Sequence, residues 1–187
     1  MREALEILGD LRRWKILTKE QCPFEQVEED CFTYRGNALK KADGIRTQVS
    51  RSVLADDSGL EVSALAGRPG VKSSRYAGQQ ATDQENNRKL LSELESIEDR
   101  SARFLTVAVV VLDSDITFIE CGLLRGSIAR EPRGSQGFGY DPLFVPVGYE
   151  ETLAELGPRV KNEISHRRKA LQKIKADLNS YADRCLG

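Results

Sequence analysis

The stretch ARFLTVAVVVL, Ala102–Leu112, decides the fold class of this chain. It is rich in valine, and β-branched residues favour a strand that packs against its neighbours. The segment Ile116–Leu124 suits an antiparallel partner, because the turn-forming residues Asp113, Ser114 and Asp115 separate the two. The sequence therefore predicts a long hairpin, with Ala102–Leu112 as a central strand.

Helical and extended patterns alternate on both sides of this hairpin. Apolar residues at helical spacing predict helices over Met1–Arg13, Thr33–Arg51, Thr82–Glu95 and Ser165–Leu178. Short apolar runs predict strands at Trp14–Leu17, Ser52–Ala55 and Leu143–Pro146, with a glycine-rich loop over Glu131–Asp141. Thr82 and Glu85 have the spacing of a capping box. The predicted fold is α/β, a single domain over 1–187 with a central mixed β-sheet flanked by helices.

The composition excludes several classes of protein. The chain has 187 residues, of which 40% are hydrophobic and 30% charged, and its formal net charge is −1. Such a balance gives no overall attraction to nucleic acid or to an anionic membrane, so neither is expected as a partner. The longest apolar run, Phe104–Leu112, is about half of what a bilayer span needs, and no secretion signal opens the chain. We expect a cytoplasmic protein.

The first candidate for chemistry is the run ADDSG, Ala55–Gly59. It follows the predicted strand Ser52–Ala55, which places Asp56 and Asp57 at a sheet edge where open α/β folds bind ligands. Oxygen ligands of this kind suit Mg²⁺, and a phosphoryl substrate supplies further ones. The alternative is a plain turn, since Asp, Ser and Gly are the residues that turns prefer.

The second candidate is the run GFGYD at the end of the glycine-rich loop, Gly137–Asp141. Glycines let a backbone approach a ligand closely, so this loop can stack a base on Phe138 and read its edge with Asp141. The alternative is a glycine-rich turn whose rings, Phe138 and Tyr140, pack into the core.

The third candidate lies at the start of the last predicted helix, which Ser165 caps. Lys161, His166 and Arg167 add donors to the backbone N–H groups that a helix N-terminus offers to an anion or an oxo group. The alternative is a capped helix with a solvated basic face. His166 is also the only histidine of the chain, which excludes zinc sites built on two imidazoles.

In this order, these runs resemble the inosine triphosphate pyrophosphatase family. The matching runs are ADDSGLEV at Ala55–Val62, GRPGV with SSRYAG at Gly67–Gly78, ATDQENN at Ala81–Asn87, REP at Arg130–Pro132, GFGYDPLF at Gly137–Phe144 and ISHRRKAL at Ile164–Leu171. The resemblance implies Mg²⁺-dependent hydrolysis of a purine nucleoside triphosphate (ITP, dITP or XTP) to the monophosphate and pyrophosphate. It also implies an elongated α/β subunit that forms a homodimer.

The resemblance also implies a role for each matching residue. Asp57 resembles the catalytic carboxylate and Mg²⁺ ligand, and Ser58 a substrate contact. The base-recognition loop is matched by Phe138, Gly139, Tyr140 and Asp141. The residues that hold the oxo face of the purine are matched by Lys161, His166 and Arg167.

The chain departs from the family pattern at two places. Family members begin with a strand that ends in a Ser/Thr-x-Asn-x-x-Lys phosphate loop, whereas Met1–Glu3 resembles the residues just after that lysine. Gly36 also precedes Asn37, where family members carry a metal-binding glutamate. We therefore expect little activity from the chain as written, and an unpaired sheet edge next to Ser52–Ala55.

These departures leave two other functions open. A nucleotide-binding protein without turnover would keep the base pocket and lack the phosphate and metal groups. An RNA-binding module would rest on local basic runs such as Arg167–Lys169, and the near-neutral net charge argues against it.

Overall fold

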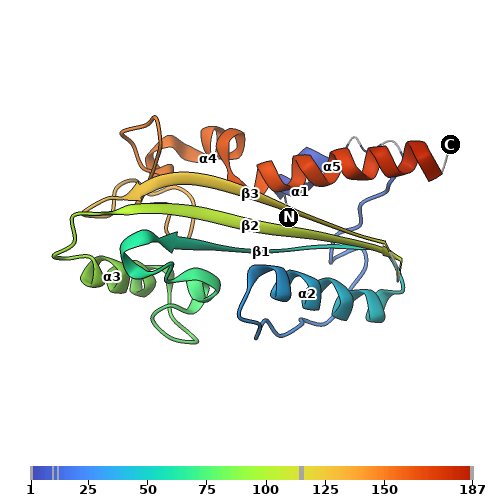
Figure 1. Ribbon diagram of the computed structural model, residues 1–187, viewed down its shortest axis with the longest axis horizontal. Coiled ribbons are helices and arrows are strands. Elements are labelled where there is room, and N and C mark those ends of the chain that lie inside the picture. The colour runs from blue at the N-terminus through green and yellow to red at the C-terminus, as the bar shows by residue number, and fades with distance from the viewer. Residues whose placement is uncertain (1, 10, 12, 114–115, 186–187) are drawn as a thin grey trace. The chain divides into compact units, whose positions relative to one another are not determined.

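The computed structural model describes residues 2–9, 11, 13–113 and 116–185. Over these residues the helices are α1 (Arg2–Leu8), α2 (Tyr34–Val49), α3 (Asp83–Glu93), α4 (Leu153–Ile164) and α5 (His166–Cys185), and the strands are β1 (Val53–Val62), β2 (Ser101–Asp113), β3 (Ile116–Ile128) and β4 (Phe144–Pro146). The strands form one sheet in the order β1-β2-β3-β4 (Figure 1). The predicted α/β class is confirmed. The described strands run antiparallel, so the expected mixed character is not seen in them.

The contacts of the chain divide it into two compact units. The first unit comprises Met1–Asp57, Thr106–Gly122 and His166–Gly187, and the second comprises Ser58–Leu105 and Leu123–Ser165. The strands β1, β2 and β3 therefore each contribute residues to both units.

In the first unit, β2 is buried on both of its faces. Successive side chains of a strand point to opposite faces of the sheet. Ala108, Val110 and Leu112 pack against α1 and α5, whereas Val109 and Val111 pack against α2. Figure 1 shows α5 and α2 on opposite sides of these strands. A strand covered on both faces is a near-continuous apolar run, which explains the valine-rich sequence.

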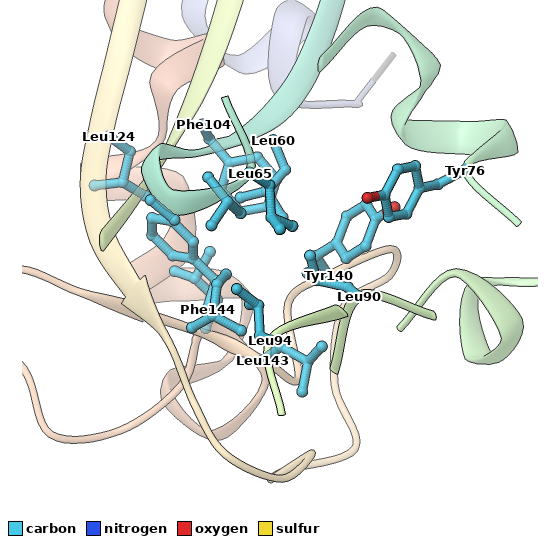
Figure 2. Close-up of a cluster of buried hydrophobic side chains, with 14 residues drawn as sticks. Leu60, Leu65, Tyr76, Leu90, Leu94, Phe104, Leu124, Tyr140, Leu143 and Phe144 are labelled. Atoms are coloured by element: carbon cyan, nitrogen blue, oxygen red, sulfur yellow. The ribbon is translucent and has the colours of Figure 1, made fainter. Parts of the chain in front are cut away.

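In the second unit, the core gathers around the pair of rings Phe104 and Phe144, whose centroids lie 4.6 Å apart (Figure 2). Leu90 and Leu94 of the α3 region are fully buried in the same cluster. The predicted capping box fixes the start of α3, because Thr82 Oγ1 accepts from the Glu85 amide and Glu85 accepts from the Thr82 amide. The β4 strand pairs antiparallel with β3, for example Val145 opposite Ser127.

The structure corrects three predictions of secondary structure. Trp14–Leu17 forms no strand, because no strand of the described sheet lies beside it to complete a ladder. β1 continues to Val62, so Asp56, Asp57 and Ser58 lie inside a strand and form neither its end nor a turn. Lys161 lies in the last turn of α4, a helix missed by the sequence analysis, and not at the start of the last helix.

Most of the other predicted elements agree with the structure, although the helix expected over Met1–Arg13 ends at Leu8. The Ala102–Leu112 and Ile116–Leu124 strands are neighbours in the sheet as β2 and β3, while Ser114 and Asp115 of their predicted turn lie outside the described residues. β1 is an end strand of the described sheet, as expected for an edge next to Ser52–Ala55. None of the described helices combines the length and the apolar character that crossing a bilayer requires.

The first unit holds the start of α5 against β3 through a glycine. A Cβ atom at Gly122 would lie 1.9 Å from the carbonyl oxygen of His166 and 2.6 Å from the amide nitrogen of Ala170. We expect Gly122→Ala to destabilise the protein by about 1 to 3 kcal/mol, because the main chain of α5 must move away from the strand. Thermal or urea unfolding measures the loss.

The neighbouring substitution Cys121→Ala is the matched control, because this side chain is exposed. It should leave the unfolding midpoint nearly unchanged. Equal midpoints for Gly122→Ala and Cys121→Ala would show that the close approach of α5 to β3 is wrong.

Candidate active site

In the first unit, two adjacent carboxylates of β1 face different helices. Val53 and Ala55 of β1 pack in the α2 cluster, whereas Leu54 packs in the α1 and α5 cluster. The same alternation directs Asp57 to α2 and Asp56 to α5. Each carboxylate therefore has partners of its own, although the two residues are neighbours in the sequence.

The partners of the two carboxylates differ in charge. Arg167 of α5 donates to Asp56 Oδ2 at 3.0 Å, which forms an ion pair. Asn37 of α2 donates from Nδ2 to Asp57 Oδ2, also at 3.0 Å. An arginine neutralises the carboxylate that it binds, whereas an amide only orients it. Asp56 is thus paired with a cation, whereas the described hydrogen bond of Asp57 comes from a neutral amide.

The side chain of Asn37 is itself fixed by burial and by a second hydrogen bond. Its side chain is 1% exposed, and its Oδ1 accepts from the Cys31 amide at 2.8 Å. Thr33 caps α2 one turn earlier by accepting from the amide of Gly36. A buried amide with both ends bonded has one stable orientation, so its Nδ2 points at Asp57.

Gly36 is closely surrounded by its own loop. A Cβ atom at this position would lie 2.9 Å from Cys31 Cβ and 3.0 Å from Thr33 Oγ1. A glutamate at Gly36, as in the family pattern, would require Cys31 and Thr33 to shift. The loop before α2 and the glycine are therefore adapted to each other.

Asp57 fits a magnesium ion that is held mainly by a substrate. Among the described residues, no group of three or more His, Cys, Asp or Glu side chains could hold a metal ion by itself. Mg²⁺ commonly takes one or two carboxylates, several waters and the phosphates of a nucleotide. An oriented carboxylate such as that of Asp57 suits this type of site.

In the second unit, Asp141 closes the glycine-rich loop. Its side chain is almost fully buried, and its Oδ2 accepts from the Phe138 amide at 2.9 Å and from Lys161 Nζ. Gly137 is required beside it, because a Cβ atom there would lie 2.2 Å from Asp141 Oδ2 and its φ is +84°. The glycine and the carboxylate together fix the shape of the loop.

Lys161 joins this loop to α4. Its ammonium group pairs with Asp141 and lies 3.9 Å from the centroid of the Phe138 ring. Phe138 is 64% exposed, so one part of its ring contacts a cation while much of the rest faces solvent. The structure thus brings together Phe138, Asp141 and Lys161. Asp141 itself is buried and bonded within the loop, so its carboxylate is not presented to a base as expected.

The two remaining residues of the loop are tied to the body of the second unit. The Gly139 amide donates to Asp83 Oδ2 at 2.6 Å, and its carbonyl accepts from Asn87 Nδ2 at 3.0 Å. Tyr140 is buried in the core of the second unit (Figure 2). Its hydroxyl donates to the Ser73 carbonyl. Burial raises the pKa of the Tyr140 phenol above its usual value, so Tyr140 stays neutral and keeps donating.

The packed-turn alternative holds for only one of the two rings. Tyr140 belongs to the hydrophobic core of the second unit, whereas Phe138 lies outside it. Ser58 is a half-buried residue of β1, and His166 is the buried first residue of α5. Arg167 bonds to Asp56 of the first unit, whereas Lys161 bonds to Asp141 of the second, so the two basic residues have separate partners.

Sequence reasoning missed the residues that support the site. Asn37 orients Asp57, while Asp83 and Asn87 hold Gly139. Asn37 and Asn87 lie on helices, where polar side chains are usually solvated, and only their burial marks them as exceptional. The one sign of them in the sequence is that each places an amide side chain on the face of a helix that is expected to be buried.

Comparisons with known proteins extend over nearly the whole chain. The sequence profile of the Ham1 family matches residues 1–177. The dITP/XTP pyrophosphatase of Clostridium tetani is 44% identical over 184 residues, which cover 97% of this chain and 92% of that protein. The dITP/XTP pyrophosphatase of Geobacter sulfurreducens is 45% identical over 181 residues, which cover 95% and 90%.

Solved structures of Ham1 proteins also match this chain over nearly its whole length. A HAM1 protein from Coxiella burnetii superimposes with a TM-score of 0.89 at 42% identity, covering 96% of this chain and 92% of that one. The Ham1 protein of Staphylococcus aureus superimposes with a TM-score of 0.86 at 37% identity, with the same coverage.

The buried ion pair of Asp141 with Lys161 of α4 should contribute more to the free energy of unfolding than an exposed ion pair within α4. We expect Asp141→Asn to lower the free energy of unfolding by about 3 kcal/mol, because it leaves the Lys161 ammonium partly buried without its counter-charge. Urea unfolding measures this loss.

Glu163→Gln supplies the control, because Glu163 forms an exposed pair with Arg159 at 3.8 Å. Its loss should stay within about 0.5 kcal/mol. If both variants lost the same amount, the Asp141–Lys161 pair would not be the support of the loop.

Proposed function

This chain belongs to the Ham1 family, and from that premise we propose that it hydrolyses the non-standard purine nucleoside triphosphates ITP, dITP and XTP to the monophosphate and pyrophosphate. The observation that carries the proposal is the identity of more than 40% with dITP/XTP pyrophosphatases along almost the whole chain. The protein is accordingly a hydrolase, and its role is to remove abnormal purine nucleotides from the nucleotide pool.

The reaction needs a water molecule to attack the α-phosphorus while the bond to the bridging oxygen breaks and pyrophosphate leaves. We propose that Asp57 binds Mg²⁺ and that Asn37 orients its carboxylate, as their hydrogen bond supports. When bound, Mg²⁺ would neutralise the charge that develops on the phosphate oxygens. Ser58, the next residue of β1, would contact the substrate.

The purine would be bound by the glycine-rich loop. Phe138 presents an exposed ring on which a base can stack, and Lys161 lies beside the ring as a donor for a 6-oxo group. Asp141 would hold Lys161 in place, as their ion pair supports. Gly139 and Tyr140 would shape the loop, and His166 and Arg167 would contribute further donors to the oxo face.

The remaining expectations rest on the family resemblance. We propose that the protein is a homodimer in the cytoplasm. The carboxylate that would bind Mg²⁺, that of Asp57, and the loop that would bind the purine are both formed in the described residues. This arrangement favours turnover over the alternative of a nucleotide-binding protein without it.

The proposed base recognition predicts a strong preference for ITP over ATP. A 6-oxo group accepts hydrogen bonds from donors such as Lys161, whereas a 6-amino group leaves them unpaired at a cost of about 1 to 3 kcal/mol each. A site with several such donors can discriminate by roughly 10⁴ in kcat/KM. The measurement is pyrophosphate release from each nucleotide with Mg²⁺ present.

The assay should compare ITP and ATP at equal concentrations of protein and of Mg²⁺. Equal turnover of ATP and ITP would contradict the proposed base recognition. Tight binding of ITP without release of pyrophosphate would favour the alternative without turnover.

The assignment of Asp57 predicts that Asp57→Asn abolishes Mg²⁺-dependent turnover and leaves the fold intact, because the substitution removes a charge at nearly constant volume. A lost contact of this kind costs several kcal/mol in the transition state. Asp56→Asn is the matched comparison on the adjacent residue, since Asp56 binds Arg167. Asp56→Asn should retain more activity, and the opposite order would show that Asp56 is the metal ligand.

A further inference from the structure

The main chain around the exposed ring of Phe138 is held from two directions. The Phe138 amide donates to Asp141 Oδ2 at 2.9 Å, and the Phe138 carbonyl accepts from the Asp141 amide at 3.2 Å. The next residue, Gly139, is bonded to α3 instead. Its amide donates to Asp83 Oδ2 at 2.6 Å, and its carbonyl accepts from Asn87 Nδ2 at 3.0 Å. All four main-chain polar groups of Phe138 and Gly139 are therefore paired.

Packing contributes little to holding Gly139 in place. A Cβ atom at Gly139 would meet nothing within 4 Å, and its φ of +59° is one that other residues rarely adopt. Phe138 has a glycine on either side, and glycine restricts the main chain less than any other residue. The ring of Phe138 is itself mostly exposed and lies outside the core. The hydrogen bonds from α3 therefore fix the main chain that follows Phe138.

The helix that supplies these bonds is well anchored. Thr82 and Glu85 form a capping box on either side of Asp83, which defines the first turn of α3. Asn86 is 2% exposed and bonds through both ends of its amide to the main chain of the preceding segment. Asp83 and Asn87 are four residues apart, so they lie on the same face of the helix. The loop is thus bonded to a fixed support.

Of the two bonds, the one from Asp83 carries a charge. Asp83 is exposed and forms no ion pair among the described residues, so its carboxylate is not neutralised by a neighbouring cation. A hydrogen bond to an ionised acceptor is stronger than one between neutral groups. Asp83 also lies in the first turn of α3, where a negative charge favours the helix itself. Positioning of the loop and stabilisation of the helix are therefore two separable roles.

We propose that Asp83 is a positioning residue for the purine. By accepting from the Gly139 amide, it keeps the ring of Phe138 beside the Lys161 ammonium, in the arrangement on which a base stacks. All of these residues belong to the second unit. The inference rests on the proposed function, in which this loop binds the purine. Asp83 acts through Gly139 and does not touch the substrate.

Loss of this bond should weaken binding of the base and leave the reaction at phosphorus unchanged. A loop that is held less firmly spends part of its time in other conformations, and the apparent affinity falls by that fraction. One hydrogen bond corresponds to a factor of about five in affinity. Pyrophosphate has no base, so its affinity should not depend on Asp83.

Two substitutions of Asp83 separate its two roles. Asp83→Ala and Asp83→Asn both remove the charge from the first turn of α3, but only asparagine keeps an oxygen that can accept from Gly139. We expect Asp83→Ala to raise the KM for ITP about fivefold with kcat nearly unchanged, the pattern of a lost binding interaction. Asp83→Asn should stay much closer to the wild-type KM. Calorimetry should show the same order for the dissociation constant of IMP, with inhibition by pyrophosphate unchanged.

Amide hydrogen exchange in the protein without nucleotide tests the bond directly. In Asp83→Ala the Gly139 amide should exchange at least about tenfold faster, because it loses its acceptor, while the amides of the last turns of α3 keep their rates. Gln84→Ala is the matched control, since Gln84 is the exposed neighbour of Asp83 in the same turn. It should change neither the exchange of Gly139 nor the KM. Thermal unfolding verifies that each variant folds.

Three results would overturn the proposal. They are unchanged exchange of the Gly139 amide in Asp83→Ala, an equal rise in KM for Asp83→Ala and Asp83→Asn, which would assign the effect to the helix charge, and an equal loss of affinity for pyrophosphate. If the wild-type protein bound IMP but released no pyrophosphate from ITP, the proposed hydrolysis would fail. The IMP affinities of the variants would then still decide the role of Asp83, whereas a wild-type protein that bound neither nucleotide would contradict both.

Discussion

Burial of β2 on both faces is the constraint on which both units depend. From Ala108 to Leu112 its side chains alternate between two apolar clusters, while Ala102 and Phe104 at its start belong to the core of the second unit. Each fully buried side chain of this size contributes about 1.5 to 3 kcal/mol, and together they outweigh any single polar contact. In β1, the strand beside β2, the face of the sheet to which each side chain points is therefore also fixed.

That alternation decides the chemistry of the first unit. Asp56 and Asp57 could compete for one partner if they lay in a loop. In a strand they point to opposite faces, so Asp56 meets Arg167 and Asp57 meets Asn37. A functional group on a strand is also held more precisely than one on a loop. The apolar pattern of β1 and β2 thus gives two neighbouring carboxylates different partners.

Helices and strands were predicted correctly where one local pattern of the sequence determines them. They were predicted poorly where contacts with other parts of the chain determine them. The valine-rich β2 and the capping box at Thr82 depend on local patterns and were correct. Trp14–Leu17 looked like a strand but forms none, because a strand exists only with a neighbour. The start of α4 carries a capping box at Thr152 and Glu155, yet Gly157 with Pro158 interrupts its periodicity and hides the helix.

The candidate site shows the same division. Asp57, Phe138 and Lys161 were predicted from motifs, and their roles stay predictions. Asn37 was not, since its importance lies in burial and in the direction of one hydrogen bond. Supporting residues of this kind emerge only when the packing around them is known.

The contrast between Phe138 and Tyr140 shows what packing leaves unexplained. Tyr140 is buried and hydrogen-bonded, so its position follows from stability alone. Phe138 is 64% exposed, and a ring in that position gains little from the core. Its loop is nevertheless fixed by Asp141, which also holds Lys161 against one side of the ring. The ion pair thus keeps a mostly solvent-facing ring in one place, which is what the proposed stacking of a purine on that ring needs.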